Sequence, residues 1–373
     1  MKFASLRLLT LAFFSLSLID SMNSDSQPPS APTKNHLGEA SRIPVGVAYC
    51  AGKRNPRTTP IIDGEFSRLT STEFYPFLLW QAPGQYRFSG ADQSVADAQR
   101  SRRPLHGHCL LYALESVCPP FLINFEGTNQ EFEAMVRDYL TVTLTRYKGK
   151  VQSYDLANEL FAYNSSSVAN TWLRRRFTSD QELFDFIGRC YQYAHAADPD
   201  ALLFYADYGQ ESSRDNYAKG WAIAHQLFRW KKAGVPVHGY ALHFHTNIYR
   251  PQQDLDRALT MAVQTGLKIH VSELDVSINW SDRDVAGQKS GVQGLTQATP
   301  DLLERQSDTF RHIALAYRRL VPAQQQFGIT VWDVGDGDSW LASQRFEKPT
   351  LFDEHYRPKP AFYGFMRGLS EAP

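Results

Sequence analysis

Two glutamates stand where apolar, strand-like segments give way to polar residues, and their type suits the hydrolysis of a glycosidic bond. Glu159 ends the run Asp155-Leu156-Ala157-Asn158-Glu159, and Glu273 lies in Val271-Ser272-Glu273-Leu274-Asp275. Hydrolysis with retention needs one carboxyl group to protonate the leaving oxygen and a second, about 5–5.5 Å away, to attack the anomeric carbon. A lone glutamate at a strand end is more often a solvated surface group, so the prediction depends on the residues around each one.

Two histidines precede Glu273 in a pattern that suits either hydrogen bonding or metal binding. Glu273 and Asp275 are two residues apart, so strand alternation points both to the same side. We expect His245, from the neighbouring strand, to hydrogen-bond between them and to keep Glu273 ionised. His243 and His245 could instead form a zinc pair or lie satisfied in the core, but no third strong ligand is obvious near them in the sequence. We therefore predict no metal ion and no cofactor.

Two tryptophans could serve as flat platforms for sugar rings, whose apolar faces stack on aromatic side chains. Trp332 follows Gly328–Val331, and Trp340 lies in Asp338-Ser339-Trp340. The alternative is that the two side chains only close the core of the fold, and this alternative is stronger for Trp340.

The elements that must position these residues alternate along the chain from about residue 43. Short β-rich runs are followed by longer amphipathic segments, which is typical of parallel strands joined by helices. Eight such units predict an α/β protein with a single-domain (β/α)8 TIM barrel; a doubly wound sheet competes, but the chain lacks a Gly-rich turn after the first strand. The predicted strands are Pro44–Ala48, Phe66–Leu69, Pro104–Leu111, Val151–Ala157, Ala201–Ala206, Val237–His243, Lys268–Ser272 and Gly328–Val331. The predicted helices include Gln130–Tyr147, Ser179–Ala197, Arg214–Ala233, Leu255–Thr265 and Leu302–Leu320.

Barrels of this kind deliver their reactive side chains at the C-terminal ends of the strands. Applied to the predicted strands, that rule selects a short set of polar and aromatic residues as candidates for chemistry and binding. The set is His108, Asn158, Glu159, Asp207, His243, His245, Glu273, Asp275 and Trp332.

The charge balance excludes partners that are gathered by long-range attraction. Lysine plus arginine and aspartate plus glutamate number 39 each in 373 residues, so no net field favours nucleic acid or anionic lipid. An uncharged polysaccharide or oligosaccharide fits better, and we expect a monomer.

The N-terminus has the pattern of a secretory signal peptide. Two positive charges in Met1–Arg7 precede the apolar stretch Leu8–Ile19, which is too short to span a membrane comfortably. No small-x-small cleavage site follows cleanly, and an ordinary disordered N-terminus is the alternative. We expect a signal peptide over residues 1–21, a flexible leader over 22–42, the hydrolase domain over 43–373, and secretion to the extracellular space or the periplasm.

The cysteines are too few and too scattered for a disulfide-stabilised mini-domain, and none forms a zinc-like Cys-x-x-Cys pair. Buried thiols are the default expectation. If the chain is exported, Cys109 and Cys118 are the first pair to test, because a short loop could bring them together. The remaining two are Cys50 and Cys190.

An ordered set of motifs over roughly residues 43–368 resembles glycoside hydrolase family 10, best known for endo-β-1,4-xylanases. Phe88-Ser89-Gly90-Ala91-Asp92 is similar to the family's FxGAD, and His106-Gly107-His108-Cys109-Leu110-Leu111-Tyr112 to RGHTLVW. Thr145-Arg146-Tyr147-Lys148-Gly149-Lys150 and Tyr154–Glu159 resemble RYKGK…WDVVNE, and Val271–Asp275 resembles ITELD. Gly328–Trp332, Asp338–Trp340, Leu351–Asp353 and Lys359–Ala361 resemble the C-terminal signature.

The resemblance implies a role for each matching position. Glu159 is implied as the general acid/base, Glu273 as the nucleophile and Asn158 as the donor to the 2-hydroxyl of the sugar that is cleaved. His108, His245, Asp275 and Trp332 match further positions of the active centre. We expect Tyr112, Tyr208, His243 and Trp340 to complete the substrate-binding set, with Asp207 and Asp275 supporting it from behind.

The departures from the family pattern concentrate on the glycone side of the cleft. Where the family has Glu-Asn-Glu-Met-Lys-Trp, this chain has Thr72–Trp80, without the lysine or both acidic partners. Tyr112 replaces a tryptophan, His243 the glutamine of QxH, and Ala113, Ala206 and Gly209 replace polar residues. Because a site built to bind a given hydroxyl discriminates strongly, these changes favour an altered sugar in that part of the cleft.

The leading hypothesis is a retaining glycoside hydrolase that cleaves β-glycosidic bonds in a polysaccharide, by default β-1,4-xylan. A glycosidase for a different β-glycan is its main variant. A non-catalytic carbohydrate-binding barrel is the alternative suggested by the lost polar contacts, and a metal-dependent hydrolase using His243 and His245 is a third hypothesis.

Overall fold

The structure of the chain is a computed structural model that describes residues 37–40, 42–49, 55–163, 165–279, 295–342 and 346–372. The predicted signal peptide and Cys50 lie outside these ranges. The compact unit is His36–Pro373. Helix α1, Leu37–Ala40, falls in the segment assigned to the leader, and its Leu37 is fully buried. The helices of the described ranges include none long and apolar enough to cross a membrane.

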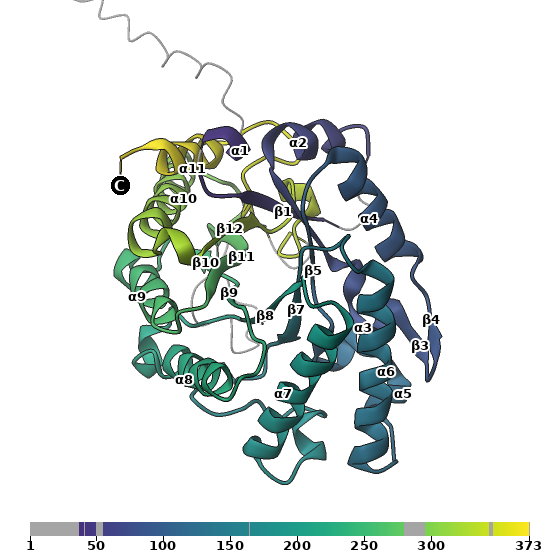
Figure 1. The fold of residues 1–373 in the computed structure, drawn as a ribbon. Helices are drawn as coiled ribbons and strands as arrows, with labels where there is room; N and C mark the ends of the chain where they lie inside the picture. Colours follow the sequence, from purple (N-terminus) through teal and green to yellow (C-terminus); the bar gives the residue numbers. More distant parts are fainter. Residues whose placement is uncertain are drawn as a thin grey trace, which may run out of the picture. The chain divides into compact units, whose positions relative to one another are not determined.

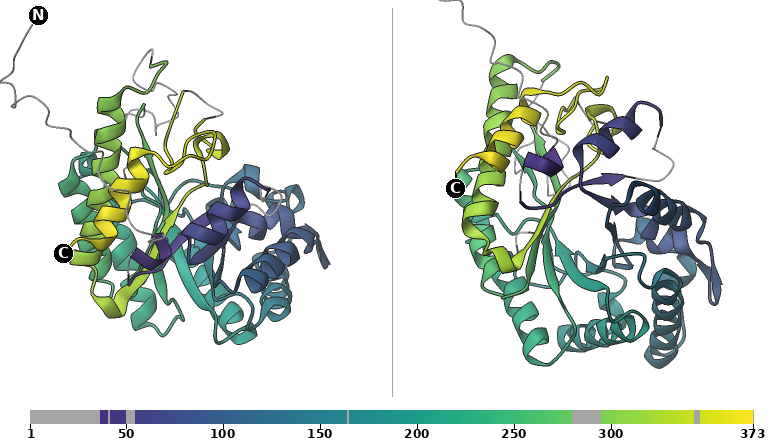
Figure 2. Two further views of the ribbon diagram at one scale, coloured as in Figure 1. Left: turned by 90° about the horizontal axis from the view of Figure 1, so that it is seen from above. Right: turned by 45° about the horizontal axis from the view of Figure 1, so that its top comes forward.

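Within the described residues, eight parallel strands close into a barrel, as the alternating pattern predicts (Figures 1 and 2). Closure comes from the pairing of β9 with β11, and the short strands β6 and β10 extend the barrel at its rim. The barrel strands are β1 Val45–Tyr49, β2 Arg68–Ser71, β5 Leu105–Gly107, β7 Ser153–Asn158, β8 Leu202–Asp207, β9 Gly239–Leu242, β11 Lys268–Ser277 and β12 Gln326–Val331. The other strands are β6 Leu111–Tyr112, β10 His245–Asn247 and the antiparallel pair β3 Trp80–Ala82 and β4 Gln85–Tyr86.

One longer helix follows each barrel strand and packs on the outside of the ring (Figure 1). Local capping residues fix where several helices begin. The Thr128 hydroxyl and the Glu131 carboxylate form a capping box at α6, and the hydroxyls of Ser179 and Thr299 cap α7 and α10. The helices are α2 Thr58–Glu65, α4 Ser89–Ser101, α6 Asn129–Tyr147, α7 Asp180–Ala197, α8 Ala218–Lys232, α9 Gln252–Val263, α10 Pro300–Leu320 and α11 Pro360–Ser370. Single turns of helix are α3 Pro76–Leu79 and α5 Pro120–Ile123.

Aromatic rings fill part of the barrel interior and so leave the strand ends for polar residues. The Phe204 and Phe327 rings lie 4.5 Å apart, and the Arg68 guanidinium lies 3.7 Å from the centre of the Phe327 ring. Gly239 is required beside them, because a Cβ there would come within 1.9 Å of the Phe204 ring. This layer makes the barrel a packed core rather than a pore.

The structure departs from the predicted elements at particular places. The strand predicted over Pro104–Leu111 is two strands, because residues 108–110 leave the sheet between β5 and β6. The helix predicted from Arg214 begins at Ala218, since Asn216 and Tyr217 adopt left-handed backbone. Helices α2, α4 and α11 were not singled out from the sequence, and α4 explains why: its buried positions carry small or polar residues.

No disulfide joins Cys109 and Cys118, the pair named as the first to test if the chain is exported. Both thiols are free and buried, as is Cys190. The Cys118 thiol instead donates to the Tyr112 carbonyl oxygen at 2.7 Å. The default expectation of buried thiols is therefore correct for the three cysteines that the structure describes.

Candidate active site

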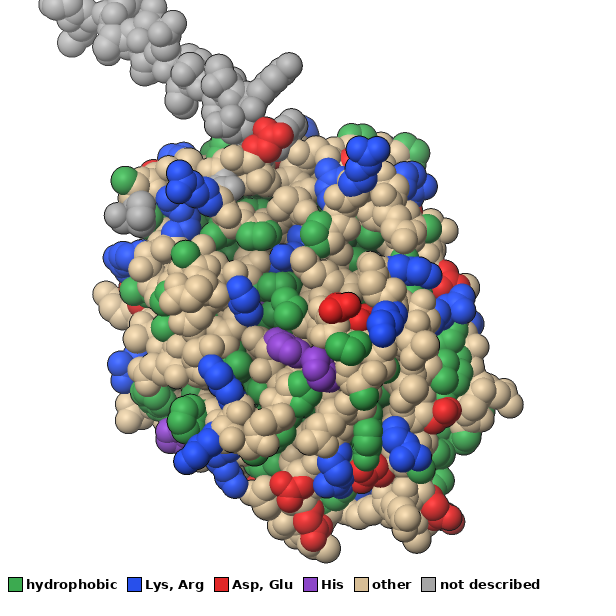
Figure 3. All heavy atoms as spheres, viewed as in Figure 1, with side chains coloured by type: hydrophobic (Ala, Val, Ile, Leu, Met, Phe, Trp, Pro, Cys, Tyr) green, Lys and Arg blue, Asp and Glu red, His purple; other side chains and the backbone are tan. Residues whose placement is uncertain are grey.

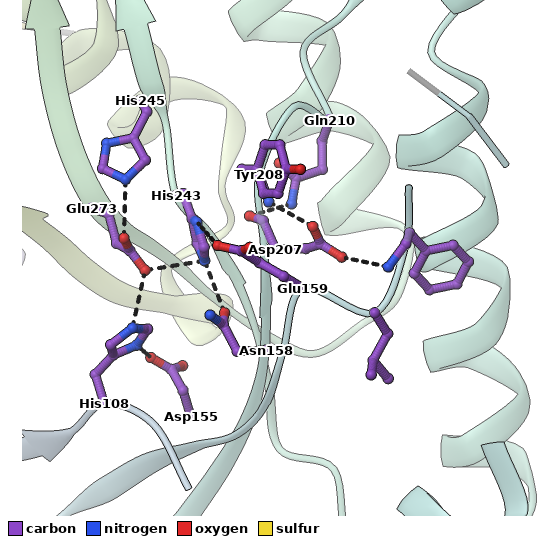
Figure 4. Close-up of polar contacts among 12 residues, drawn as sticks. His108, Asp155, Asn158, Glu159, Asp207, Tyr208, Gln210, His243, His245 and Glu273 are labelled. Atoms are coloured by element: carbon purple, nitrogen blue, oxygen red, sulfur yellow. Dashed lines mark hydrogen bonds and ion pairs between the residues drawn. The ribbon is translucent and has the colours of Figure 1, made fainter. Parts of the chain in front are cut away.

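The residues selected by the strand-end rule come together at the C-terminal mouth of the barrel, and Figure 4 labels all of them except Asp275 and Trp332. Asn158 and Asp207 are the last residues of β7 and β8, while His108, Glu159, His243 and Trp332 follow directly on their strands. Glu273 lies within the long strand β11. Parallel strands all end on the same rim, so residues far apart in sequence become neighbours.

Glu273 is held by histidines from three directions. His245 Nε2 lies 3.0 Å from Glu273 Oε2, His243 Nε2 lies 3.1 Å from Oε1, and His108 Nε2 lies 3.6 Å from Oε1. Burial alone raises the pKa of the Glu273 carboxyl, but His243, His108 and His245 outweigh burial and lower it to about 2. Glu273 is therefore ionised throughout the neutral range.

The predicted bridge by His245 is confirmed. Its Nδ1 lies 2.9 Å from Asp275 Oδ2 while its Nε2 faces Glu273. Although burial lowers the pKa of the His245 ring, the two carboxylates raise it well above its usual value. The imidazole thus carries a proton between two anions and fixes the orientation of Glu273.

The buried histidines His106 and His108 share one carboxylate, that of Asp155, next to Glu273. His106 Nε2 and His108 Nδ1 both lie 2.8 Å from Asp155 Oδ2. Despite its full burial, the pKa of Asp155 lies well below its ordinary value because the two imidazoles stabilise its charge. Asp155 therefore holds the His108 ring with its Nε2 directed at Glu273 (Figure 4).

His243 lies between the two glutamates. Its Nε2 approaches Glu273 and lies 3.1 Å from Asn158 Oδ1, while its Nδ1 lies 3.7 Å from Glu159 Oε1 (Figure 4). Burial lowers the pKa of the His243 ring to about 4. Glu273 and Asp207 oppose this change, whereas the positive charges of His245 and His108 add to it. A neutral imidazole can therefore contact both carboxyl groups without adding a charge to either side.

Glu159 has the opposite protonation behaviour from Glu273. Burial raises the pKa of its carboxyl to about 7, and the charges of Asp207 and Glu273 act in the same direction. The Tyr112 hydroxyl, which hydrogen-bonds this carboxyl, and Lys219 oppose the rise. The Glu159 backbone is left-handed, with φ of +54°, a conformation that costs a non-glycine residue about 1–2 kcal/mol and is typical of functional sites.

A fully buried ion pair lies behind Glu159. Lys219 Nζ is 2.8 Å from Asp207 Oδ1, and neither side chain reaches the solvent. Lys219 also donates to the Phe161 carbonyl oxygen at 3.1 Å and lies 3.8 Å from the centre of the Tyr208 ring. The pair fixes Tyr208, whose ring stacks on His243 at 6.2 Å.

Both tryptophans lie at the site. Trp332 packs edge-on against His108 and His245, with ring centres 5.4 and 6.1 Å away. Trp340 donates from Nε1 to Asp275 Oδ2 at 2.9 Å, and 36% of it stays exposed. Trp340 is therefore not enclosed in the core, and its role as a platform for a sugar ring stays a prediction.

Aromatic residues form the wall at the divergent segment, and we call Tyr75, Phe77 and Tyr112 the aromatic strip. The Tyr75 ring stacks on Tyr112 at 6.2 Å and on Phe77 at 6.1 Å. Phe77 is 39% exposed, whereas Trp80 from the same segment is buried against Tyr139. The segment thus presents aromatic rings in the region where the family pattern has a lysine and two acidic residues.

Sequence reasoning missed four residues of this arrangement: His106, Asp155, Lys219 and Tyr75. Asp155 had a detectable signal, since it is an acid in an apolar strand with the same alternation as Glu159. Lys219 had none, because a lysine at the start of an amphipathic helix is normally exposed.

Among the described residues, one group has the composition and spacing to hold a metal ion: His243, His245 and Glu273. Their ligand atoms all lie within 4.8 Å of one another. The third ligand that the sequence did not offer is thus Glu273 itself. On the face drawn in Figure 3, lysine, arginine and acidic side chains are scattered rather than gathered into one patch, in keeping with the balanced charge.

Comparison with known proteins agrees with this geometry. The family model of glycosyl hydrolase family 10 matches residues 34–367. Endo-beta-1,4-xylanase Xyn10C of Cellvibrio japonicus is 28% identical over 348 residues, which cover 88% of this chain and 56% of that protein. An endo-1,4-beta-xylanase of Geobacillus stearothermophilus is 30% identical over 290 residues, which cover 75% of this chain and 82% of that protein.

The fold is also similar to a solved structure. Native xylanase10C from Cellvibrio japonicus has a TM-score of 0.82 at 26% identity, covering 92% of this chain and 75% of that chain. The chain spans little more than half the length of the Cellvibrio japonicus protein Xyn10C.

Proposed function

The chain belongs to glycosyl hydrolase family 10, and we propose that it is a retaining β-glycosidase acting on a polysaccharide, with β-1,4-xylan as the default substrate. The observation that carries the proposal is the separation of the two carboxyl pKa values, about 7 for Glu159 and about 2 for Glu273, across one neutral imidazole. Such a divergence assigns one carboxyl group as the acid and the other as the ionised nucleophile.

In the first step, the Glu273 carboxylate attacks the anomeric carbon while protonated Glu159 gives its proton to the departing glycosidic oxygen. The C–O bond to the leaving sugar breaks, and an ester between Glu273 and the glycone forms. His245 and His108 hold the Glu273 carboxylate in orientation. The amide nitrogen of Asn158 has no hydrogen-bond partner among the described residues, which supports its role as a donor to the sugar.

In the second step, Glu159 has lost its proton and acts as a base toward water. Water attacks the anomeric carbon, its proton passes to Glu159, and the ester bond to Glu273 breaks. Both groups return to their starting states, so no cofactor is consumed. The Tyr112 hydroxyl stabilises the ionised form of Glu159 that this step requires.

The substrate is recognised differently on the two sides of the carboxylates. Xylan is the default because the two relatives compared above are xylanases. The aromatic strip supports stacking of sugar rings on the glycone side, where polar groups are few. A β-glycan other than xylan is therefore the variant that a substrate panel must include.

The test compares two substitutions on two kinds of substrate. Glu273→Ala is expected to abolish hydrolysis of both polysaccharides and aryl β-glycosides, since no ester can form. Glu159→Ala is expected to abolish polysaccharide hydrolysis but to spare ester formation with an aryl β-xyloside, whose phenolate leaves without a proton. Reducing-sugar release from a panel of β-glycans and stopped-flow release of phenolate are the measurements.

The exposed Glu126 supplies the matched control, since Glu126→Ala removes a carboxylate that makes no described contact with an active-site residue. Unchanged hydrolysis in Glu273→Ala would contradict the proposal. Binding of glycans by wild type without release of sugar from any of them would favour a non-catalytic carbohydrate-binding barrel. Secretion and a monomeric state remain predictions from the sequence, tested by the N-terminus of exported protein and by light scattering.

A further inference from the structure

We propose that the mouth of the barrel is also an inhibitory binding site for a divalent transition-metal ion such as Zn²⁺, held by His243, His245 and Glu273. The inhibition rests on the proposed function, because it requires Glu273 to be the nucleophile. The binding itself depends only on the three side chains.

The ligand atoms already converge. His243 Nε2 lies 3.1 Å from Glu273 Oε1, and His245 Nε2 lies 3.0 Å from Oε2. Zinc bonds of about 2.0–2.2 Å in tetrahedral geometry separate ligand atoms by about 3.3–3.5 Å. The ion therefore enters with small shifts of side chains rather than a rearrangement of the strands that carry them.

One oxygen of the group lacks a hydrogen bond. Glu273 Oε1 is buried and accepts no hydrogen bond from any described residue, so its 3.1 Å approach to His243 lacks hydrogen-bond geometry. His243 Nδ1 is likewise buried and without a hydrogen bond among the described residues. Because leaving a buried polar atom without a partner costs free energy, a cation that coordinates Oε1 is stabilised there.

The second ring nitrogen of His245 already contacts a carboxylate, which is the usual arrangement for a histidine that binds a metal ion. Its Nδ1 faces Asp275 Oδ2 at 2.9 Å, and Trp340 Nε1 donates to the same oxygen at 2.9 Å. A carboxylate behind a histidine ligand fixes the ring and raises its basicity. Two imidazoles and one carboxylate select zinc, copper or nickel over magnesium and calcium, which prefer oxygen ligands.

Metal binding replaces the hydrogen that His245 Nε2 shares with Glu273. The His245 proton leaves to solvent, and the neutral His243 ring, whose Nε2 lies 3.1 Å from the acceptor Asn158 Oδ1, moves its own proton to Nδ1. Zn²⁺ then bonds to the two Nε2 atoms and the carboxylate, and the Glu273 lone pairs can no longer attack an anomeric carbon. The ion and the sugar thus exclude each other. The site depends on His243, because two strong ligands alone would remain without it. The family motif has a glutamine at this position, and the amide of a glutamine is a poor zinc ligand.

The experiment titrates metal-stripped protein with CoCl₂ and ZnCl₂. We expect one equivalent of Co²⁺ to give visible absorption bands of a tetrahedral ion and Zn²⁺ to displace it, whereas MgCl₂ has no effect. Calorimetry of His243→Gln and Glu273→Gln should show zinc affinity lowered by more than the roughly 10–100-fold typical of losing an outer-shell partner. His195→Gln is the matched control, since this histidine lies near His238 on another part of the barrel.

For wild type, Zn²⁺ should inhibit aryl β-glycoside hydrolysis competitively, and a chelator should restore activity. Undiminished zinc affinity in both His243→Gln and Glu273→Gln, or loss of binding only in His195→Gln, would overturn the site. Metal binding that leaves hydrolysis unchanged would overturn the inhibition. If wild type hydrolyses no glycan, the cobalt spectrum still decides the metal site, so the two proposals fail separately.

Discussion

The two sides of the barrel mouth differ in the kind of interaction that shapes them. On one side, β7, β8, β9, β10 and β11 carry a charged network in which His245 contacts Glu273 and Asp275 at 2.9–3.0 Å. On the other side, Tyr75, Phe77 and Tyr112 form the aromatic strip, with ring centres 6.1–6.2 Å apart.

The difference separates chemistry from recognition. Charges held at fixed short distances set protonation states, and those states decide the reaction. Stacked aromatic rings offer contact area with little directional preference. They therefore decide which sugar binds, and they tolerate substitution by other aromatic residues. We therefore expect substitutions in the charged network to affect turnover or stability, and substitutions in the strip to affect substrate binding.

The largest effect is expected from the buried pair of Lys219 and Asp207. Lys219→Met leaves the Asp207 carboxylate buried without its cation, which should lower the free energy of unfolding by about 3–5 kcal/mol. Urea unfolding measures it. Arg319→Met, which breaks a half-exposed pair with Asp256, is the control and should cost at most about 1 kcal/mol. Equal losses of unfolding free energy in the two variants would contradict the larger contribution expected from the buried pair.

Removal of the bridging histidine should be the next largest effect. In His245→Ala, Glu273 loses one oriented hydrogen bond and Asp275 loses its cation, so kcat should fall on the order of 10²–10³-fold. Steady-state kinetics on an aryl β-xyloside provides the number. His312→Ala is the matched control, because His312 makes a similar contact with Asp256 on the outer helices. A change in KM alone would place His245 in binding rather than in catalysis.

The aromatic strip should respond through KM. Tyr75→Ala removes a stacking surface worth about 1 kcal/mol, so KM for an oligosaccharide should rise about fivefold while kcat changes little. Tyr75→Phe keeps the ring and should keep KM. A fall in kcat equal to the fall in kcat/KM would show that the strip acts in the transition state, which would break the division proposed here.

The smallest effect is a shift in pH dependence, at the residue where the two sides meet. The Tyr112 hydroxyl lowers the pKa of Glu159, so Tyr112→Phe should raise that pKa above about 7. Because the first step needs protonated Glu159, the alkaline limb of kcat/KM should move to higher pH. Tyr112→Trp keeps an N–H donor and should move the limb less; a shift to lower pH in Tyr112→Phe would contradict the contact.

The strands and long helices were predictable because their periodicity and caps are local. Segments with regular apolar spacing, such as α6 and α10, were found almost to their ends. Helix α4 was not, since its buried face is made of Ala91, Ser94, Val95 and Asp97. The split of β5 from β6 was also hidden, because nothing in Pro104–Leu111 marks where the chain leaves the sheet.

The sequence alone predicted that Glu159 and Glu273 lie together and that His245 bridges Glu273 to Asp275, because these features depend on strand alternation and on the rule that strand ends meet at one rim. The tertiary structure alone decided how the carboxyl groups are tuned. The pKa values depend on burial and on the neighbouring side chains of His243, His108, Asp207 and Lys219, which three different strands and one helix bring within a few ångströms. Electrostatic interaction depends on distance in space, and that distance is not encoded in any local stretch of the chain.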